Sequence, residues 1–210
     1  MTKPSGRTPR RRHERKRPQR YILRVLSEGK VTEPSYLSEW ARRNRQSVGI
    51  KLDDTGMTPD ALVHRAKQYL KDRRPRRADP DFDEIWCVFD KDAHPNLAQA
   101  INEAGQSEIE VVVSNPCFEL WLVLHAREQT AWIDRHAVQR LASTLGLADG
   151  KRIPDTARQA LVEGFETARQ RARALDERHA GNGSPPRENP STDVWRLVDR
   201  LRNVPEAVLA

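Results

Sequence analysis

Three acidic residues stand where apolar stretches of the sequence end. Glu28 lies in the run LSEGK, and Asp90 and Asp92 lie in the run VFDKD. In an open α/β sheet, ligands bind outside the carboxyl ends of the strands. Carboxylates gathered at that edge repel one another unless a cation lies among them. The pattern therefore predicts a divalent cation, Mg²⁺ or Mn²⁺, that takes part in chemistry on phosphates.

The spacing of the two aspartates suits a shared ion, because alternate side chains of an extended segment point the same way. Glu28 belongs to a different predicted strand, so the three carboxylates converge only if the two strands are neighbours. Such a site can orient a phosphate and activate water, and Glu28 could act as a general base or hold a second ion. The alternative is structural: Glu28 is a loop acid, and Asp90 and Asp92 are helix caps.

A second group of polar residues lies in the run SNPCFELWLVLH, which follows another apolar segment. Asn115 can donate to a phosphate or cap the next helix. Glu119 is an acid in an apolar stretch, and a metal or a basic partner would remove the cost of burying it. We treat Glu119 as a further candidate metal ligand, with a first-turn helix acid as the alternative. His125 is a weaker candidate, and its alternative is a structural histidine.

Basic residues flank these acids. Lys30 follows Glu28 by two positions, and Lys91 separates the two aspartates. Either lysine can contact a substrate phosphate or simply neutralise the acids. His94 precedes a proline and is either a site residue or a helix cap.

Positive charge is concentrated at the start of the chain. The net charge is +7, yet residues 1–20 carry nine lysines and arginines against one acid, and the remainder is close to neutral. Such a block is typical of a disordered arm that binds phosphate backbones. Arg10, Arg11 and Arg12 are the candidate contacts with substrate. The alternative is a solubilising tail.

The elements that must position these residues follow from the apolar pattern. Segments rich in branched residues predict four strands, over 21–27, 48–52, 85–89 and 109–114. Between them, helices begin at Thr32, at Thr58 and at Pro95, and the third ends at Gly105. This alternation predicts a mostly parallel α/β sheet flanked by helices.

The second half of the chain has a helical pattern. We expect a buried helix over 118–125, helical structure over 130–179, a loop over 180–190 and a last helix capped by Ser191 or Thr192. One long helix should carry an inward stripe of Leu161, Phe165, Ala168, Ala172 and Leu175. The predicted organisation is a disordered basic arm (1–20), an α/β core (21–128) and a helical extension packed on the core (129–210).

Composition argues against two classes of protein. The two cysteines, Cys87 and Cys117, lie in apolar surroundings, so we expect buried free thiols rather than a structural zinc site. No apolar run approaches the ~20 residues of a membrane helix. The basic start has no apolar segment behind it, unlike a signal peptide. We therefore expect a cytoplasmic protein with no membrane partner.

Four runs together resemble RloB-like proteins. They are EGKVTEPSY (28–36), FDKDAHP (89–95), SNPCFELWLVLH (114–125) and NPSTDVWRLVDRL (189–201), and the resemblance spans about residues 20–201. It implies a Toprim-like α/β domain, the catalytic fold of topoisomerases, DnaG-type primases and OLD-family nucleases. Toprim sites use a Glu after the first strand and a DxD after a later one, and Glu28, Asp90 and Asp92 match these positions.

The resemblance also implies a biological role. Relatives are associated with bacterial restriction and phage-defence loci, some beside an ATPase gene. This implies a nuclease effector in abortive infection, with an AAA/SMC-like ATPase as partner. Toprim proteins often carry a further acid near the DxD, where this chain has Lys91, and no topoisomerase-type domain with a nucleophilic tyrosine is recognisable. These departures favour metal-dependent hydrolysis of DNA or RNA over strand passage.

Two other functions remain open from the sequence. The first is a non-catalytic subunit that binds nucleic acid or an ATPase and uses the acids for a structural ion. The second is a phosphatase-like enzyme with Asp90 as a covalent nucleophile, although such enzymes usually place their DxD on the first strand. The sequence does not determine whether the substrate is DNA or RNA, nor the oligomeric state.

Overall fold

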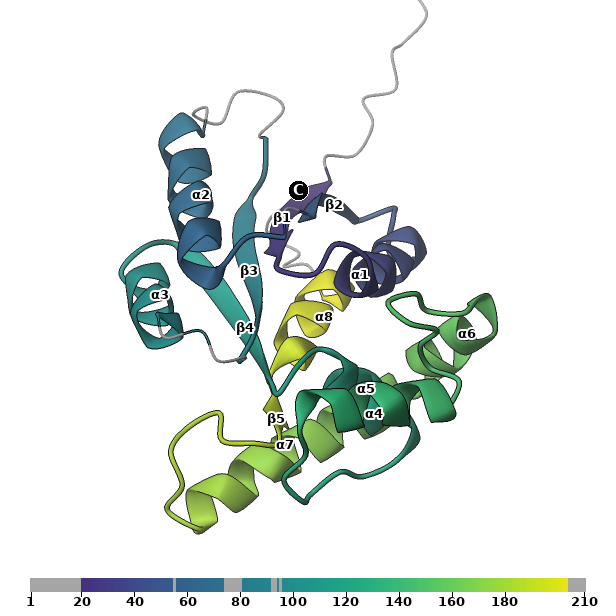
Figure 1. Ribbon diagram of the computed structural model, residues 1–210. Coiled ribbons are helices and arrows are strands. Elements are labelled where there is room, and N and C mark those ends of the chain that lie inside the picture. Colours follow the sequence, from purple (N-terminus) through teal and green to yellow (C-terminus); the bar gives the residue numbers. More distant parts are fainter. Residues whose placement is uncertain (1–19, 55, 74–80, 92–93, 95, 204–210) are drawn as a thin grey trace, which may run out of the picture.

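The computed structural model of the protein describes residues 20–54, 56–73, 81–91, 94 and 96–203. Five strands form one sheet in the order β2-β1-β3-β4-β5 (Figure 1). Their bounds are β1 Tyr21–Ser27, β2 Val48–Asp54, β3 Glu84–Asp90, β4 Ile109–Asn115 and β5 Ser191–Thr192. The first four are parallel, and β5 pairs antiparallel with β4. This confirms the predicted mostly parallel α/β sheet, and β1 and β3 are neighbours.

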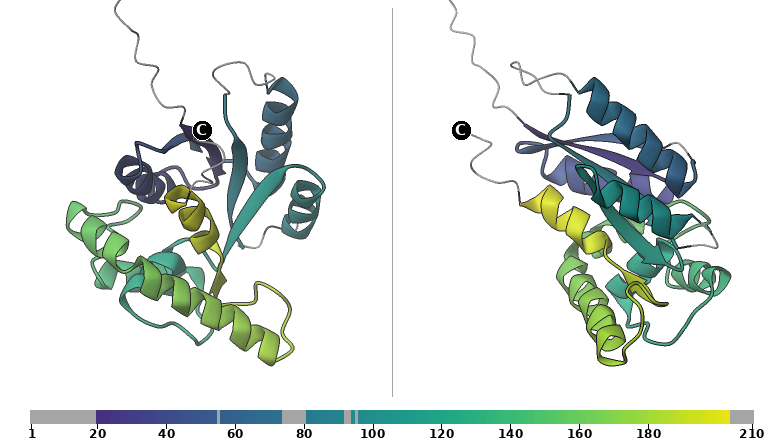
Figure 2. Two further views of the ribbon diagram at one scale, coloured as in Figure 1. Left: turned by 180° about the vertical axis from the view of Figure 1, so that it is seen from behind. Right: turned by 90° about the vertical axis from the view of Figure 1, so that its left-hand side faces the viewer.

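Helices cover both faces of the sheet (Figure 2). Their bounds are α1 Thr32–Arg43, α2 Pro59–Asp72, α3 Leu97–Gly105, α4 Glu119–Ala126, α5 Arg135–Thr144, α6 Asp155–Glu163, α7 Phe165–Gly181 and α8 Val194–Arg202. Alternation along β3 explains the two layers. Cys87 and Phe89 face the cluster that contains α2 and α3, whereas Trp86 and Val88 face the cluster that contains α1, α4, α7 and α8. Asp90 has the same parity as Val88, so it ends the strand on the α1 and α4 side.

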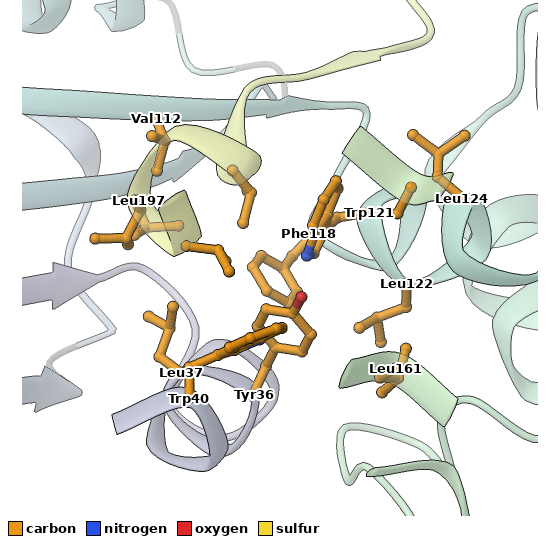
Figure 3. Packing of buried hydrophobic residues seen from close by; sticks show 14 of the residues in the cluster. Tyr36, Leu37, Trp40, Val112, Phe118, Trp121, Leu122, Leu124, Leu161 and Leu197 are labelled. Atoms are coloured by element: carbon orange, nitrogen blue, oxygen red, sulfur yellow. The ribbon is translucent and has the colours of Figure 1, made fainter. Parts of the chain in front are cut away.

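The larger core cluster is rich in aromatic rings. Figure 3 shows Tyr36 and Trp40 of α1 beside Phe118 and Trp121 at the start of α4. The ring centroids of Tyr36 and Phe118 are 5.7 Å apart at an edge-to-face angle, and those of Trp40 and Phe165 are 5.2 Å apart. Edge-to-face pairs of this kind add to the free energy gained by burial. The cluster therefore joins residues of the predicted core to residues of the predicted extension.

The single long helix predicted across 161–175 is wrong. The structure ends α6 at Glu163 and begins α7 at Phe165, with Gly164 between them. A Cβ at Gly164 would lie 3.3 Å from the carbonyl oxygen of His125, so the chain approaches α4 closely at this glycine. The predicted apolar stripe is nevertheless buried across both helices.

Two predicted caps also differ from the structure. Ser191 and Thr192 form β5, opposite Asn115 and Ser114, rather than the first turn of the last helix. The hydroxyl of Thr32 donates to the carbonyl of Lys151 (2.9 Å) instead of capping α1. In both cases a long-range partner competes successfully with the local hydrogen bond.

Other predictions concern cysteines and membranes. Cys87 and Cys117 are buried and free, as predicted. Within the described residues, no helix is long and apolar enough to cross a membrane. The basic arm over 1–20 lies outside the described residues except for Arg20, and so do Arg10, Arg11 and Arg12.

Candidate active site at the carboxyl ends of the strands

Glu28 and Asp90 meet because β1 and β3 are adjacent. Ser27 pairs with Val88 in the sheet, so the next residues of the two strands leave the sheet side by side. The amide of Asp90 donates to Glu28 Oε2, at 3.4 Å. Glu28 and Asp90 therefore lie next to each other, as expected for neighbouring strands. Asp92 lies outside the described residues.

Asp90 is a buried carboxyl, with 6% of its surface exposed. Its Oδ1 accepts a hydrogen bond from the amide of Phe118 (2.9 Å), at the positive end of α4. Its Oδ2 lies 3.7 Å from a guanidinium nitrogen of Arg135. Burial, followed by the charges of Glu33, Glu119 and Glu28, raises the pKa of Asp90 well above its usual range, although Arg135 opposes the shift.

Glu33 is a site residue that the sequence pattern did not reveal. It lies in the first turn of α1, where an acid is expected for helix stability alone, yet only 4% of its surface is exposed. Its Oε1 accepts from the amide of Gly29, at 3.0 Å. Burial and the charge of Glu119 raise the pKa of Glu33. A Cβ at position 29 would lie 1.9 Å from Glu33 Oε2, so only glycine lets this carboxylate approach the loop.

Glu119 is the fourth carboxylate of this edge. It is the first residue of α4 and is 7% exposed. It lines the same cavity as Asp90 and Glu33, and its charge, after burial, contributes to raising the pKa of both. The sequence-based assignment of Glu119 to the same edge as Glu28 and Asp90 therefore agrees with its position, although its role is untested.

These side chains line one cavity of about 500 Å³. Its acidic lining is Glu28, Glu33, Asp90 and Glu119, its basic lining is Lys30, His94, Arg135 and Lys151, and its exposed apolar rim includes Val31 and Met57. His94 Nε2 lies 3.0 Å from Glu28 Oε1, so this histidine contacts an acid of the cavity. Nothing local in the sequence connects Arg135 or Lys151 to this cavity, because both come from the second half of the chain.

Two predicted substrate contacts are engaged elsewhere. The ammonium group of Lys91 donates to the carbonyl of Arg187 (3.0 Å), and Asn115 Nδ2 donates to the same oxygen (2.8 Å). Neither residue lines the cavity. Arg187 has φ +60°, a left-handed conformation uncommon for a residue with a side chain. Lys91 and Asn115 thus tie this loop to the ends of β3 and β4.

His125 has both ring nitrogens engaged within the core. Its Nδ1 donates to the carbonyl of Trp121 (2.8 Å), and its Nε2 accepts from the hydroxyl of Tyr36 (3.2 Å). Burial lowers the pKa of His125 to about 4. This is the geometry of the structural alternative, a neutral histidine held among aromatic rings.

The acid-lined cavity can be tested for its fit to a divalent cation. Within the described part of the chain, no three His, Cys, Asp or Glu side chains lie close enough together to hold an ion as they stand. The donors are nonetheless carboxylate oxygens, which Mg²⁺ and Mn²⁺ prefer. Four acids share the cavity with Arg135 and His94, and burial, followed by the charges of the other three acids, raises the pKa of Asp90. A divalent cation would offset the repulsion among these acids, so the chemistry of the donor set fits the ion.

Comparison with known proteins gives one match. The family model described as RloB-like protein matches residues 23–201, which is most of the chain. No curated protein and no solved structure matches the chain. The match covers Glu28, Glu33, Asp90, Glu119 and Arg135, and therefore the acid-lined cavity as a whole.

Proposed function

The chain belongs to the RloB-like protein family, and from this premise we propose that it is a metal-dependent endonuclease that hydrolyses phosphodiester bonds at the acid-lined cavity. One observation carries the proposal. A buried aspartate, Asp90, ends a strand among Glu28, Glu33 and Glu119, and its burial, together with the charges of these acids, raises its pKa. Like charges are rarely buried together without a positive ligand to offset them.

The acids would hold the cation. Glu28 and Asp90 come from adjacent strands and are the first candidates, with Glu33 and Glu119 beside them. Asp92 is also a predicted ligand. When bound, Mg²⁺ or Mn²⁺ would supply charge stabilisation of the phosphate and a more acidic bound water.

The remaining side chains of the cavity suit the handling of phosphate. Arg135 lies beside Asp90 and can bind a phosphate oxygen. Lys30 and Lys151 line the same cavity and can bind neighbouring phosphates of a strand. The imidazole of His94 lies 3.0 Å from Glu28, where it can orient this carboxylate or accept a proton from it. The basic arm, with Arg10, Arg11 and Arg12, would attract the phosphate backbone.

The proposed biological role follows from the family resemblance. We expect the chain to act as an effector in anti-phage defence by abortive infection, together with an AAA/SMC-like ATPase. A nuclease that damages its own host needs restraint, and we propose that the ATPase partner supplies it. The substrate is DNA or RNA.

The test is a cleavage assay on plasmid DNA, tRNA and total RNA, with Mg²⁺ or with EDTA, and with and without the candidate ATPase. Asp90→Ala and Glu28→Gln should each lower cleavage about 100-fold or more, because even outer-shell changes at metal sites cost 10–100-fold. Glu110→Gln is the matched control, since Glu110 is an exposed acid of β4 outside the cavity. Full activity in both site variants would overturn the proposal.

A non-catalytic subunit is the second candidate. It is favoured by the absence, among the described residues, of three acids already close enough to hold an ion. In this case the chain would bind nucleic acid or an ATPase without cleaving. Deletion of residues 1–20 should weaken nucleic-acid binding and make its salt dependence shallower under both hypotheses. Only the nuclease would lose cleavage in Asp90→Ala while retaining binding.

A further inference from the structure

Trp132 is an unusually exposed ring. It lies between α4 and α5, and 69% of its surface is exposed, whereas the other exposed large apolar side chains of the described residues reach 37%. Burying a tryptophan is strongly favourable. An exposed tryptophan does not contribute this free energy to folding, so we expect a role of Trp132 at the surface.

The backbone on both sides of this ring is held in place. Gln129 Nε2 donates to the carbonyl of Ala131, at 2.9 Å. Ile133 donates its amide to Asn189 Oδ1 (3.1 Å), and its carbonyl accepts from Asn189 Nδ2 (2.8 Å). The side chain of Ile133 packs against the larger core cluster. Trp132 is thus presented on a fixed backbone, which lowers the entropy lost when a ligand binds to it.

The indole ring has no planar neighbour of its own. Within the described part of the chain, no other aromatic ring and no guanidinium lies against Trp132, although Tyr36, Trp40, Trp121 and Phe165 all contact one another's edges. A stacking surface is therefore available to a planar group from outside.

The charges around Trp132 suit a nucleic-acid strand. Arg127 and Arg140 are exposed on the same segment, which also exposes the acids Glu128 and Asp134. Arg135, three residues after Trp132, lines the acid-lined cavity beside Asp90. Three residues span about 10 Å at most. The segment has arginines on both sides of Trp132 along the chain, and these can contact the phosphates on either side of a stacked base.

We propose that Trp132 stacks on an unpaired nucleobase next to the acid-lined cavity, so that the substrate is a single strand or an unpaired segment of a folded nucleic acid. A regular duplex hides the faces of its bases in its own stack and cannot offer one to the ring. The proposal rests on the proposed nuclease function for the position of the cut. Binding to the ring, however, can be measured without cleavage.

The experiment measures binding of the full chain, in EDTA, to fluorescein-labelled 12-nucleotide DNA and RNA strands and to the matching duplexes. Trp132→Ala should weaken single-strand binding about 5- to 150-fold, the range for loss of one base–aromatic stack. Duplex binding and the salt dependence should remain unchanged, because no phosphate contact is removed. Trp132→Phe should recover most of the affinity. Leu145→Ala, which removes an exposed apolar side chain beyond the other end of α5, should bind as the wild type does.

Wild-type affinity of Trp132→Ala for both single strands would overturn the proposal, as would an equal loss on duplexes. A change in oligomeric mass with intact nucleic-acid binding would also overturn it, because the ring would then contact protein. Whichever strand loses more affinity identifies the sugar of the preferred substrate and supports the proposal. If Asp90→Ala and Glu28→Gln cleave normally while Trp132→Ala loses single-strand binding, the nuclease centre is wrong and the stacking site stands.

Discussion

The two ends of strand β3 carry carboxylates in opposite electrostatic surroundings. At its start, Glu84 accepts from Tyr21, Trp86 and Arg200, and Arg200 pairs with it through two guanidinium nitrogens. Burial acts to raise the pKa of Glu84, but these hydrogen bonds outweigh it and lower the pKa. At the other end, burial and three acids raise the pKa of Asp90, against a single arginine at 3.7 Å.

The difference distinguishes an acid whose partners all lie within the fold from an acid that we propose binds a cation. Glu84 has its compensating charge and hydrogen bonds within the chain, so it needs nothing from outside. Asp90 instead lies among three other acids of the cavity, Glu28, Glu33 and Glu119, with Arg135 at 3.7 Å. Perturbed pKa values of this kind gather at functional sites. The comparison can be tested at each end of the strand.

The largest effect on stability is expected at Glu84. Glu84→Gln should lower the free energy of unfolding by about 1–3 kcal/mol, because Arg200 loses its counter-charge in a partly buried place. Urea unfolding measures this, with Glu110→Gln as the control. Glu110 pairs with Arg196 at 2.7 Å but is half exposed, so its loss should cost less than about 1 kcal/mol. Equal effects of the two variants would remove the contrast.

Substitution of Asp90 should raise the free energy of unfolding, whereas substitution of Glu84 lowers it. Asp90→Asn keeps the acceptor for the amide of Phe118 and removes a buried like charge, so it should raise the free energy of unfolding by about 1 kcal/mol in EDTA. Destabilisation comparable to that of Glu84→Gln would make Asp90 a structural acid.

Asp90 and Glu84 should also change the stability of the protein with pH in opposite directions. The folded state binds the Asp90 proton more tightly than the unfolded state, so wild-type stability from this group falls as the pH rises above 3.8. Glu84, with its lowered pKa, contributes stability that is present above pH 4.5 and is lost as the pH falls below that value. The measurement is the free energy of unfolding as a function of pH between 3.5 and 8. Asp90→Asn should reduce the loss of stability toward high pH, and Glu84→Gln should reduce the loss toward low pH.

A separate effect on stability is the response to added cation. At tenfold excess over its Kd, Mg²⁺ should stabilise the wild type by about 1.4 kcal/mol, which corresponds to a rise in Tm of about 3–6 °C for a domain of this size. Asp90→Asn should lose this rise, and Glu84→Gln should keep it. Thermal melts with Mg²⁺ and with Ca²⁺ measure it. An equal rise in all three proteins would place the ion elsewhere.

Local patterns in the sequence were sufficient for the four parallel strands and for two of the acids that follow them, but not for β5. The apolar segments ending at Ser27 and at Phe89 predicted strands that the structure contains, and parallel pairing placed Glu28 beside Asp90. Glu119 was found because an acid in an apolar stretch is conspicuous. The prediction of one long helix failed at Gly164, where the chain approaches α4 closely and the helix is interrupted although the apolar stripe continues.

Other features of the site have no local signal. Glu33 looks like an ordinary first-turn acid until α1 packs against the sheet and buries it. Lys91 looks like a phosphate contact until the loop carrying Arg187, 96 positions away, takes its ammonium group. The stacking role of Trp132 likewise depends on its exposure, which only the packed structure reveals.

The sequence by itself determined the strand ends, the acids that follow them, the basic arm and the family, because each depends on neighbours along the chain. Only the tertiary structure decided which groups share the cavity. It brought Arg135 and Lys151 to the acids, directed Lys91 and Asn115 away, and held His125 among aromatic rings as a neutral residue. The physical reason is that the burial of a residue, and the charges that surround it once buried, arise from contacts between segments far apart in the sequence.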